Sequence, residues 1–357
     1  MKAVVLEKPG QLTVKDIPMR VCKADEVLVK VRACGICGSD LKYYKGQNPW
    51  TQHTLGKNMD SPPNMVIGHE FTGEVVEAGD PVYSYLIGKR VFAQPYNTCG
   101  MCEFCKTGRY NLCRQTKHIG HGAGWEEMDY YPGGMAEFCP VWATHAYELP
   151  DHISFEEATF LDPLAVSIHA VNRSGFKPGC DVLILGSGPI GLCIMQVVKA
   201  FGCARVFCTD VYDRALKIAA DTGADYLMNV NNTDVVGFVM EKTKNRGVDL
   251  VFDTVGSEDA QHTAFKLLAC SGTLVNLVSG PQEITIKLQD LSGERSIIGS
   301  SNDLYEDVLT GMKLMASGRV QTKPLITHRL PLQEVDKGFH LLLDKINTGA
   351  VKIIVFP

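Results

Sequence analysis

Four cysteines lie close together in the chain and could hold a metal ion: Cys99, Cys102, Cys105 and Cys113, with the spacing C-x2-C-x2-C-x7-C. Four thiolates form a closed tetrahedral shell that suits zinc and leaves no position for a substrate. Short spacings make the chelation local, so the metal can fold its own loop. Iron–sulfur ligation is the alternative, but the bacterial ferredoxin spacing ends in C-x3-C-P and this one does not. We therefore expect a structural zinc site.

A second group of residues offers mixed ligands, in the segments Cys37-Gly38-Ser39-Asp40 and Gly68-His69-Glu70. A catalytic zinc ion takes about three protein ligands and keeps an open position for a reactant. Each segment alone is weak evidence, because a lone cysteine or histidine is a buried structural residue more often than a metal ligand. Their occurrence together with the cysteine loop and a nucleotide-binding turn favours a catalytic metal site.

That turn is Gly186-Ser187-Gly188-Pro189-Ile190-Gly191, which matches G-x-G-x-x-G between an apolar strand and a helix. Gly186 allows the tight turn, Gly188 lets a pyrophosphate approach, and Gly191 lets the helix pack on the strand. The helix that opens with Pro189 and Ile190 offers its free N–H groups to phosphate. We predict a dinucleotide-binding turn.

Asp210 ends the next predicted strand. A carboxylate there accepts hydrogen bonds from both ribose hydroxyls and repels a 2′-phosphate, so we expect NAD to be preferred over NADP. Arg214 could instead accept a 2′-phosphate or stack on adenine. A helix N-cap is the alternative role for Asp210.

The chain has 357 residues, a length that suggests two domains. The predicted secondary structure differs between the first part of the chain and the rest. The first 150 residues are β-rich and irregular, with strands at 27–31 and 73–77. From about residue 155, strands at 181–185, 204–209, 248–252 and 273–277 alternate with helices such as 190–201 and 214–221, and a last strand covers 351–356. Alternating strands and helices predict a parallel sheet.

Composition excludes several classes of protein. Hydrophobic content of 45%, charged content of 21% and a net charge of −5 are typical of a globular protein and argue against a nucleic-acid-binding surface. The first segment meets a charge too early for a signal peptide, and the longest uncharged stretch, 182–198, is short and interrupted by glycine and proline. We expect no membrane span, and cytoplasmic residence by default.

The motifs, in this order, resemble those of the zinc-containing medium-chain dehydrogenases, over essentially the whole chain and most closely in the sorbitol, other polyol and threonine dehydrogenase branches. The resemblance implies an α/β protein in two parts. A GroES-like β-rich catalytic domain would cover 1–155 and be completed by about 300–357. A Rossmann domain with a doubly wound parallel sheet would cover 156–299. A homo-oligomer, dimer or tetramer, is also implied.

The resemblance further implies that Cys37 and His69 hold a catalytic zinc ion, with Glu70 or Asp162 completing the site. Asp162 stands where the polyol branch usually has glutamate, so it could act through water. Nicotinamide contacts are implied for the segments 277–279 and 299–301, which include Leu277, Ser279 and Ser300.

The expected chemistry follows from the metal. Zinc lowers the pKa of a bound hydroxyl, so a secondary alcohol can lose its proton near neutral pH and pass a hydride to NAD. Ser39 is placed to carry the proton away, and Asp40 to fix the tautomer of His69. A turn hydrogen bond is the alternative role for Ser39, and a solvated loop acid for Asp40. Lys42 stands where the family often has a relay histidine.

Substrate choice should lie in two stretches that exceed the family's usual spacing, 37–69 and 118–135. The first includes Trp50 and His53, and the second, which begins at His118, holds His121, Trp125, Glu126, Glu127, Tyr130 and Tyr131. Aromatic side chains together with acids and histidines could form a polar pocket for a sugar or cyclitol. A surface or oligomer-contact loop is equally consistent.

We therefore predict an NAD-dependent dehydrogenase that carries two zinc ions and acts on a secondary alcohol of a polyol, sugar or cyclitol. The alternatives are a threonine-dehydrogenase-like oxidation of an amino alcohol and a non-catalytic, zinc-stabilised nucleotide-binding protein. The non-catalytic protein should have lost a ligand of the open site, yet Cys37, His69 and Glu70 are all present.

Overall fold

The computed structural model describes residues 1–57, 59–122, 124–280 and 283–357 and divides the chain into two compact units. Unit 1 comprises Met1–Asp162 and Ile326–Pro357, and unit 2 comprises Pro163–Leu325. The chain returns to unit 1 later than the expected residue near 300. The strand β16 (Ser296–Gly299) and the helix α10 (Tyr305–Ala316) account for the difference, because both still belong to unit 2.

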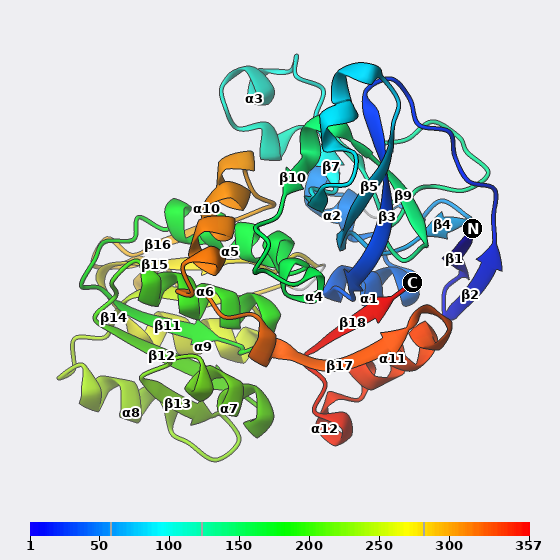
Figure 1. Ribbon diagram of the computed structural model, residues 1–357. Helices are drawn as coiled ribbons and strands as arrows, with labels where there is room; N and C mark the ends of the chain where they lie inside the picture. Colours follow the sequence, from blue (N-terminus) through cyan, green and yellow to red (C-terminus); the bar gives the residue numbers. More distant parts are fainter. Residues whose placement is uncertain (58, 123, 281–282) are drawn as a thin grey trace. The chain divides into compact units, whose positions relative to one another are not determined.

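Unit 2 is built on a six-stranded sheet whose order is β13-β12-β11-β14-β15-β16 (Figure 1). Besides β16, its strands are β11 (Asp181–Leu185), β12 (Arg205–Asp210), β13 (Tyr226–Asn229), β14 (Val248–Asp253) and β15 (Leu268–Asn276). Every neighbouring pair is parallel. The order runs outwards in both directions from β11 and β14, as in the doubly wound Rossmann fold. The predicted fold class of this part is confirmed.

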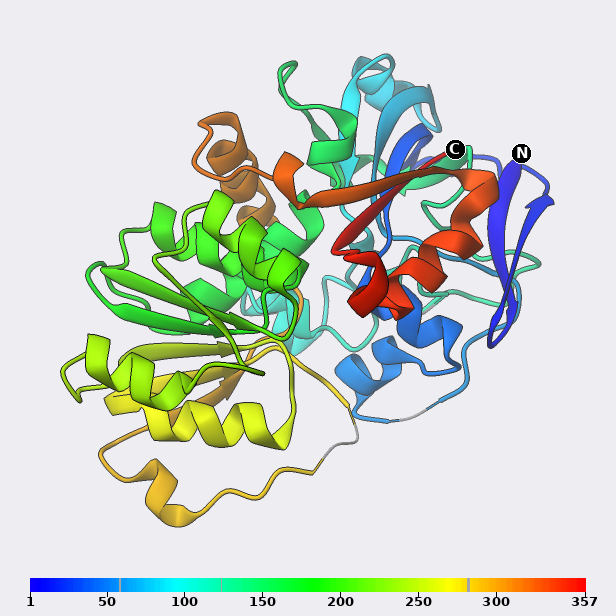
Figure 2. The same cartoon turned by 90° about the horizontal axis from the view of Figure 1, so that it is seen from below.

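Helices cover both faces of that sheet, α6 and α7 on one side and α8 and α9 on the other (Figure 2). Their bounds are α6 (Pro189–Ala200), α7 (Asp213–Asp221), α8 (Val235–Lys242) and α9 (Glu258–Leu267). All residues of β11 are buried as a result, which explains why every residue after Asp181 in this strand is apolar. Within the described residues, no helix is long and apolar enough to cross a membrane.

Unit 1 contains a seven-stranded sheet of order β10-β6-β5-β3-β18-β17, with β9 pairing with β3. The strands are β3 (Glu26–Gly35), β5 (Glu70–Ala78), β6 (Arg90–Ala93), β9 (Phe138–Trp142), β10 (Ala146–Glu148), β17 (Ile326–Pro331) and β18 (Lys352–Phe356). The C-terminal strand β18 therefore lies inside the sheet, next to β3 from the first part of the chain (Figure 1). The predicted β-rich fold of this unit is confirmed.

Unit 1 also has a smaller sheet of order β2-β1-β4, formed by β1 (Lys2–Lys8), β2 (Gln11–Asp16) and β4 (Met65–Val66). A two-stranded sheet pairs β7 (Tyr96–Asn97) with β8 (Lys117–His118). Two short helices, α1 (Gly38–Tyr44) and α2 (Pro49–Leu55), follow β3. Apolar side chains such as Phe71, Met135 and Phe339 form a core that joins the early strands to α11 (Val335–Leu343). The core thus fixes the carboxyl end of β3, where Cys37 follows.

Candidate active site and zinc centres

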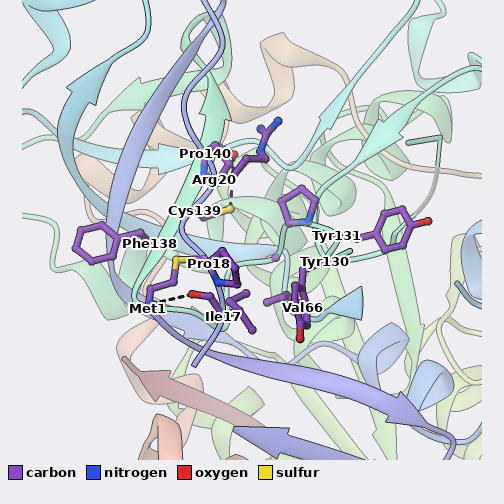
Figure 3. Close-up of a pocket in the computed structure, with 12 residues that line it drawn as sticks. Met1, Ile17, Pro18, Arg20, Val66, Tyr130, Tyr131, Phe138, Cys139 and Pro140 are labelled. Carbon is purple, nitrogen blue, oxygen red and sulfur yellow. Dashed lines mark hydrogen bonds between the residues drawn. The ribbon is translucent and has the colours of Figure 1, made fainter. Parts of the chain in front are cut away.

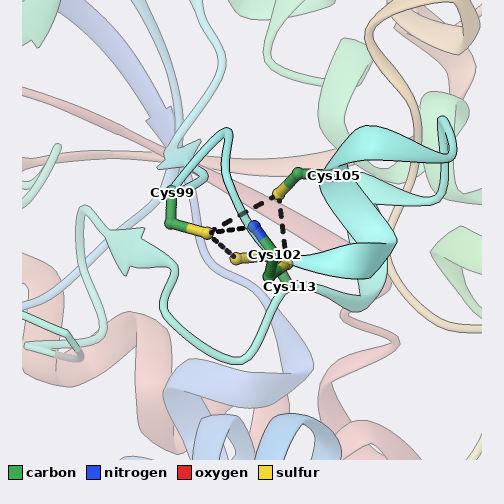
Figure 4. Close-up of side chains that lie close together, drawn as sticks. All are labelled: Cys99, Cys102, Cys105 and Cys113. Atoms are coloured by element: carbon green, nitrogen blue, oxygen red, sulfur yellow. Dashed lines mark hydrogen bonds between the residues drawn. The ribbon is translucent and has the colours of Figure 1, made fainter.

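The four cysteines of the predicted closed site converge on one point (Figure 4). The Sγ atoms are 3.9 Å apart for Cys99 and Cys105, 3.5 Å for Cys102 and Cys105, and 3.6 Å for Cys99 and Cys113. Four sulfurs about 2.3 Å from a tetrahedral zinc ion would be roughly 3.8 Å apart. All four cysteines are free thiols. The donor set and spacing therefore fit a zinc ion.

The backbone around this cysteine cluster supports the thiolate form. The N–H of Cys102 donates to Sγ of Cys99, and the N–H of Gln115 donates to Sγ of Cys113, each at 3.4 Å. Backbone N–H groups of Met101 and Cys102 lower the pKa of the Cys99 thiol to about 6, whereas burial raises that of Cys113 to about 12. A metal ion must therefore displace protons from some of these thiols when it binds.

The mixed-ligand group is assembled by the register of two neighbouring strands. Gly35 at the end of β3 pairs with Glu70 at the start of β5, and Cys37 caps the helix α1 directly after β3. One ligand atom each from Cys37, His69 and Glu70 lies within 4.8 Å of the others. A thiolate, an imidazole and a carboxylate form a donor set suited to a catalytic zinc ion.

Ser39 and Asp40 both face His69. The Oγ atom of Ser39 lies 3.4 Å from Nε2 of His69. Asp40 is fully buried, and one of its carboxylate oxygens accepts the N–H of Cys37 at 2.8 Å. The other oxygen lies 3.6 Å from Nδ1 of His69. This distance is too long for a hydrogen bond but close enough for the carboxylate and a charged imidazole to attract each other. Burial opposes the charged imidazole, yet Asp40 and Cys37 raise the pKa of His69 well above its usual value.

Two of these buried atoms, Oδ1 of Asp40 and Nδ1 of His69, have no hydrogen-bond partner within the described residues. Burying such groups unpaired costs free energy. A metal ion held by His69 would orient its imidazole towards this carboxylate, as metal-bound histidines commonly are oriented. The arrangement therefore fits a metal at His69 with Asp40 behind it.

Glu70 is 1% exposed, and its carboxylate pairs with the ammonium group of Lys352, which is also 1% exposed. Asp162, at the start of α5 (Leu161–Arg173), lies near enough for His69 and Glu70 to act on it electrostatically. Burial raises the pKa of Asp162 to about 6. Among the described residues, Asp162 is not one of the three whose ligand atoms lie within 4.8 Å of one another.

Sequence reasoning missed Lys352. The signal in the sequence is a lysine within an apolar strand. A charged side chain is rarely buried without a partner, so a lysine at this position indicates a buried acid. The partner is Glu70, far away along the sequence.

The glycine turn of unit 2 has the expected local geometry. Gly186 has φ +91°, a conformation that favours glycine. A side chain at Gly191 would collide with the carbonyl oxygen of Gly186. Gly188 caps α6, Pro189 is the first residue of that helix, and the space around Gly188 is open. The open side of Gly188 leaves room for a phosphate at the helix N-terminus.

Asp210 lies at the carboxyl end of β12 and is anchored by the backbone. Its two oxygens accept the N–H of Ser187 at 2.7 Å and the N–H of Tyr212 at 2.9 Å. The N-cap of α7 is Tyr212, so the alternative that Asp210 caps this helix is wrong. Arg214 is exposed in the first turn of α7.

The remaining predicted cofactor residues follow the next strands. Leu277 and Ser279 come after β15, and Ser300 comes after β16. The N–H of Ser300 donates to Asn276 at 3.0 Å, and that of Leu277 donates to Asp253 at 3.0 Å. These residues thus share the carboxyl edge of the sheet with Gly186 and Asp210, the edge where open α/β sheets bind ligands.

A small cavity in unit 1 lies among Met1, Arg20, Tyr130, Tyr131, Phe138 and their neighbours (Figure 3). Its volume of about 30 Å³ holds only about one or two water molecules. None of the predicted ligand residues lines it. Tyr130 and Tyr131, which belong to the stretch 118–135, therefore contribute to this cavity, which is too small for an alcohol substrate.

Comparison with known proteins agrees with this geometry. Residues 23–151 match the alcohol dehydrogenase GroES-like domain, and residues 189–317 match the zinc-binding dehydrogenase domain. The sorbitol dehydrogenase of Bacillus subtilis is 31% identical over 358 aligned residues, which cover 100% of this chain and 97% of that relative. This chain belongs to the zinc-binding, medium-chain alcohol dehydrogenase family.

Solved structures resemble this dehydrogenase along its whole length. An alcohol dehydrogenase from Escherichia coli in complex with NADH has a TM-score of 0.87 and 27% identity, covering 100% of this chain and 99% of that one. A zinc-binding dehydrogenase from Sinorhizobium meliloti bound to NADP has a TM-score of 0.87 and 30% identity, with the same coverage. The prediction that the dehydrogenase is an enzyme acting on a CH–OH group is confirmed.

Proposed function

We propose that this dehydrogenase reversibly oxidises a secondary alcohol group of a polyol, sugar or cyclitol, with NAD as the hydride acceptor. The observation that carries the proposal is the group formed by Cys37, His69 and Glu70, with Ser39 beside it. The similarity to a sorbitol dehydrogenase over the whole chain supports a polyhydroxylated substrate.

We assign the catalytic zinc ion to Cys37 and His69, with Glu70 as the third ligand and Asp162 acting on the site by its charge. When bound, zinc supplies a Lewis acid that makes an alcohol easier to deprotonate. Ser39, 3.4 Å from His69, carries the proton away from the reacting hydroxyl. Asp40 holds the imidazole of His69 in place. The second zinc ion belongs to the cysteine cluster and stabilises its loop.

The choice of NAD rests on Asp210. Its carboxylate is held by two backbone N–H groups in a position to accept ribose hydroxyls and to repel a 2′-phosphate. Arg214 is the residue that would favour NADP, and relatives of this chain bind either cofactor. Gly188 would let the pyrophosphate approach the backbone, while Gly186 and Gly191 shape the turn that receives it. Leu277, Ser279 and Ser300 would contact the nicotinamide.

A substrate panel tests the proposal. The zinc-loaded protein is mixed with sorbitol, xylitol, myo-inositol or threonine, and with NAD or NADP, while the absorbance of the reduced cofactor is followed. We expect oxidation of at least one polyol or cyclitol with NAD, and none by Cys37→Ala. Oxidation of threonine alone, or activity with NADP alone, would contradict the proposal.

We also infer a homo-oligomer, a dimer or tetramer, in a reducing compartment such as the cytoplasm. The edge strand β16 carries Ile297, which is 37% exposed, and the nearby Leu288 is 90% exposed. Exposed apolar side chains beside an unpaired strand edge commonly mark an interface. The thirteen free thiols suit a reducing environment. Light scattering of the purified protein tests the oligomeric state, and a monomer at micromolar concentration would contradict it.

A further inference from the structure

Two histidine rings from the stretch 118–135 lie against the ligand histidine of the proposed catalytic site. His118 and His121 are stacked, with ring centroids 3.9 Å apart and an interplanar angle of 11°. The ring of His121 meets His69 edge to face at 4.5 Å, and that of His118 lies 5.7 Å from His69. We call His118 and His121 the imidazole pair. The pair brings two polar rings next to a residue of the reaction centre.

The backbone between the two histidines is built for this placement. Gly120 has φ +80°, and a side chain there would collide with the carbonyl oxygen of Gly68, next to His69. The N–H of Gly120 donates to Pro132 at 2.7 Å. Because Gly120 lies directly against Gly68, the residues on either side of it reach His69. The segment is therefore part of the site's structure and not a loose surface loop.

Trp125 holds the other end of this segment. Its indole N–H donates to the carbonyl oxygen of His118 at 3.0 Å, and its ring stacks on Trp142 of β9 at 5.4 Å. The first of the two longer stretches also reaches the pair, since the ring of Tyr43 in α1 lies 5.1 Å from that of His121. The two stretches that exceed the family's usual spacing thus meet around the imidazole pair.

The hydrogen bonding of His118 defines what it can offer a ligand. Its Nδ1 lies 2.8 Å from the carbonyl oxygen of Ile119. A carbonyl oxygen only accepts, so Nδ1 carries the proton, and Nε2 of the neutral ring is an acceptor. His118 is partly exposed, whereas His121 is 8% exposed. His118 is therefore the member of the pair that a ligand can reach, with His121 supporting it from behind.

We propose that the imidazole pair recognises a hydroxyl group on the carbon next to the one that is oxidised. That hydroxyl would donate its hydrogen to Nε2 of His118, and the stack on His121 would hold the ring in place. A substrate with a single hydroxyl group could not make this bond, so the pair would favour vicinal diols and polyols. The inference rests on the proposed function, because it assumes that the alcohol reacts beside His69.

The test compares butane-2,3-diol with butan-2-ol, which have the same carbon skeleton and differ only in the neighbouring hydroxyl. The ratio of their kcat/KM values is measured for the wild type, for His118→Phe and for His121→Phe. Phenylalanine keeps an aromatic ring for packing and removes the ring nitrogens. Because both alcohols are measured in one sample, partial loss of zinc or of folded protein lowers both rates alike and leaves the ratio unchanged.

We expect the wild type to prefer the diol and His118→Phe to lower the ratio by about tenfold, as for one lost hydrogen bond. His121→Phe should lower it less, since that ring acts through His118. The control is His145→Phe, another buried histidine of unit 1, which packs on Trp142 and should leave the ratio unchanged. An unchanged ratio in His118→Phe would overturn the proposal.

A wild type that oxidises neither of these two short alcohols gives no ratio of rates, and the substrate panel described above then decides the proposed function separately. In that event, the affinities of butane-2,3-diol and butan-2-ol are measured by calorimetric titration into the zinc-loaded protein with NADH. The two affinities then decide whether the imidazole pair recognises the second hydroxyl group. Tighter binding of the diol that is lost in His118→Phe supports recognition by the pair. Equal binding of the two alcohols, or equal binding by the wild type and the variant, overturns it.

Discussion

Lys352 and Glu70 form an ion pair in the interior of unit 1, where each side chain is only 1% exposed. The pair joins the last strand of the chain to one of the proposed zinc ligands. Burial opposes the charged form of Lys352, but the carboxylate of Glu70 raises the pKa of its ammonium group above the usual value. A buried pair of this kind contributes little net stability while intact, whereas removing one partner leaves an uncompensated charge.

We expect Lys352→Met to lower the free energy of unfolding by about 3–5 kcal/mol, because Glu70 would remain buried without its partner. Urea denaturation of the zinc-free proteins measures the loss, because a zinc ion bound at Glu70 would itself balance the carboxylate charge. The double variant Glu70→Gln/Lys352→Met removes both charges and should recover most of the stability. A double variant as unstable as the single one would show that the pair is not the cause.

The identity of the third zinc ligand can be tested with the same double variant. If Glu70 is the ligand, Glu70→Gln/Lys352→Met should hold one zinc ion per chain and lose activity, although its core carries no unpaired charge. Asp162→Asn should keep two zinc ions, since Asp162 acts only through its charge. Metal content is read by mass spectrometry of the dialysed proteins. The reverse pattern, with zinc lost only in Asp162→Asn, would assign the ligand to Asp162.

Removing a thiol from the cysteine cluster should destabilise the protein and leave the proposed catalytic zinc ligands in place. We expect Cys105→Ser to bind one zinc ion fewer and to lose the fold of its loop, because three thiolates no longer close the shell. Thermal unfolding and zinc content measure the two effects. Cys270→Ser, at an exposed cysteine outside both groups, is the matched control and should behave as the wild type.

Cofactor preference should depend on Asp210. We expect Asp210→Asn to raise the KM for NAD by roughly 10- to 100-fold, as for the loss of a charged hydrogen bond of about 1.5–3 kcal/mol. The same substitution should lower the KM for NADP, because the 2′-phosphate no longer meets a negative charge. Steady-state kinetics with both cofactors test this. Arg214→Ala is the control and should raise only the KM for NADP. If Asp210→Asn keeps the same preference for NAD, Asp210 does not select the cofactor.

Features that depend on local spacing could be predicted from the sequence, and features that depend on distant pairing could not. The cysteine cluster and the glycine turn each lie within a short segment, so residue type and spacing indicated their geometry. The convergence of Cys37 with His69 needed the family resemblance, because it depends on the register between β3 and β5. Lys352 was missed since only the pairing of β18 with β3 brings it to Glu70.

The stacking of His118 on His121 was also beyond sequence reasoning. The stretch 118–135 was identified as unusual, but its aromatic residues divide between two places. His118, His121 and Trp125 pack near His69, while Tyr130 and Tyr131 line the small cavity. No periodicity in the sequence indicates this division.

The position of β18 inside the sheet of unit 1 has a consequence for synthesis on the ribosome. Unit 2 is one continuous segment that emerges before β17 and β18 do. Domains generally fold as units while the chain is made, so unit 2 can finish folding while unit 1 still lacks an interior strand. Until that strand arrives, the carboxyl end of β3 at Cys34 and Gly35 lacks its partner strand, and the ammonium group of Lys352 is not yet beside Glu70. The nascent chain therefore completes its cofactor-binding half first and its catalytic half last.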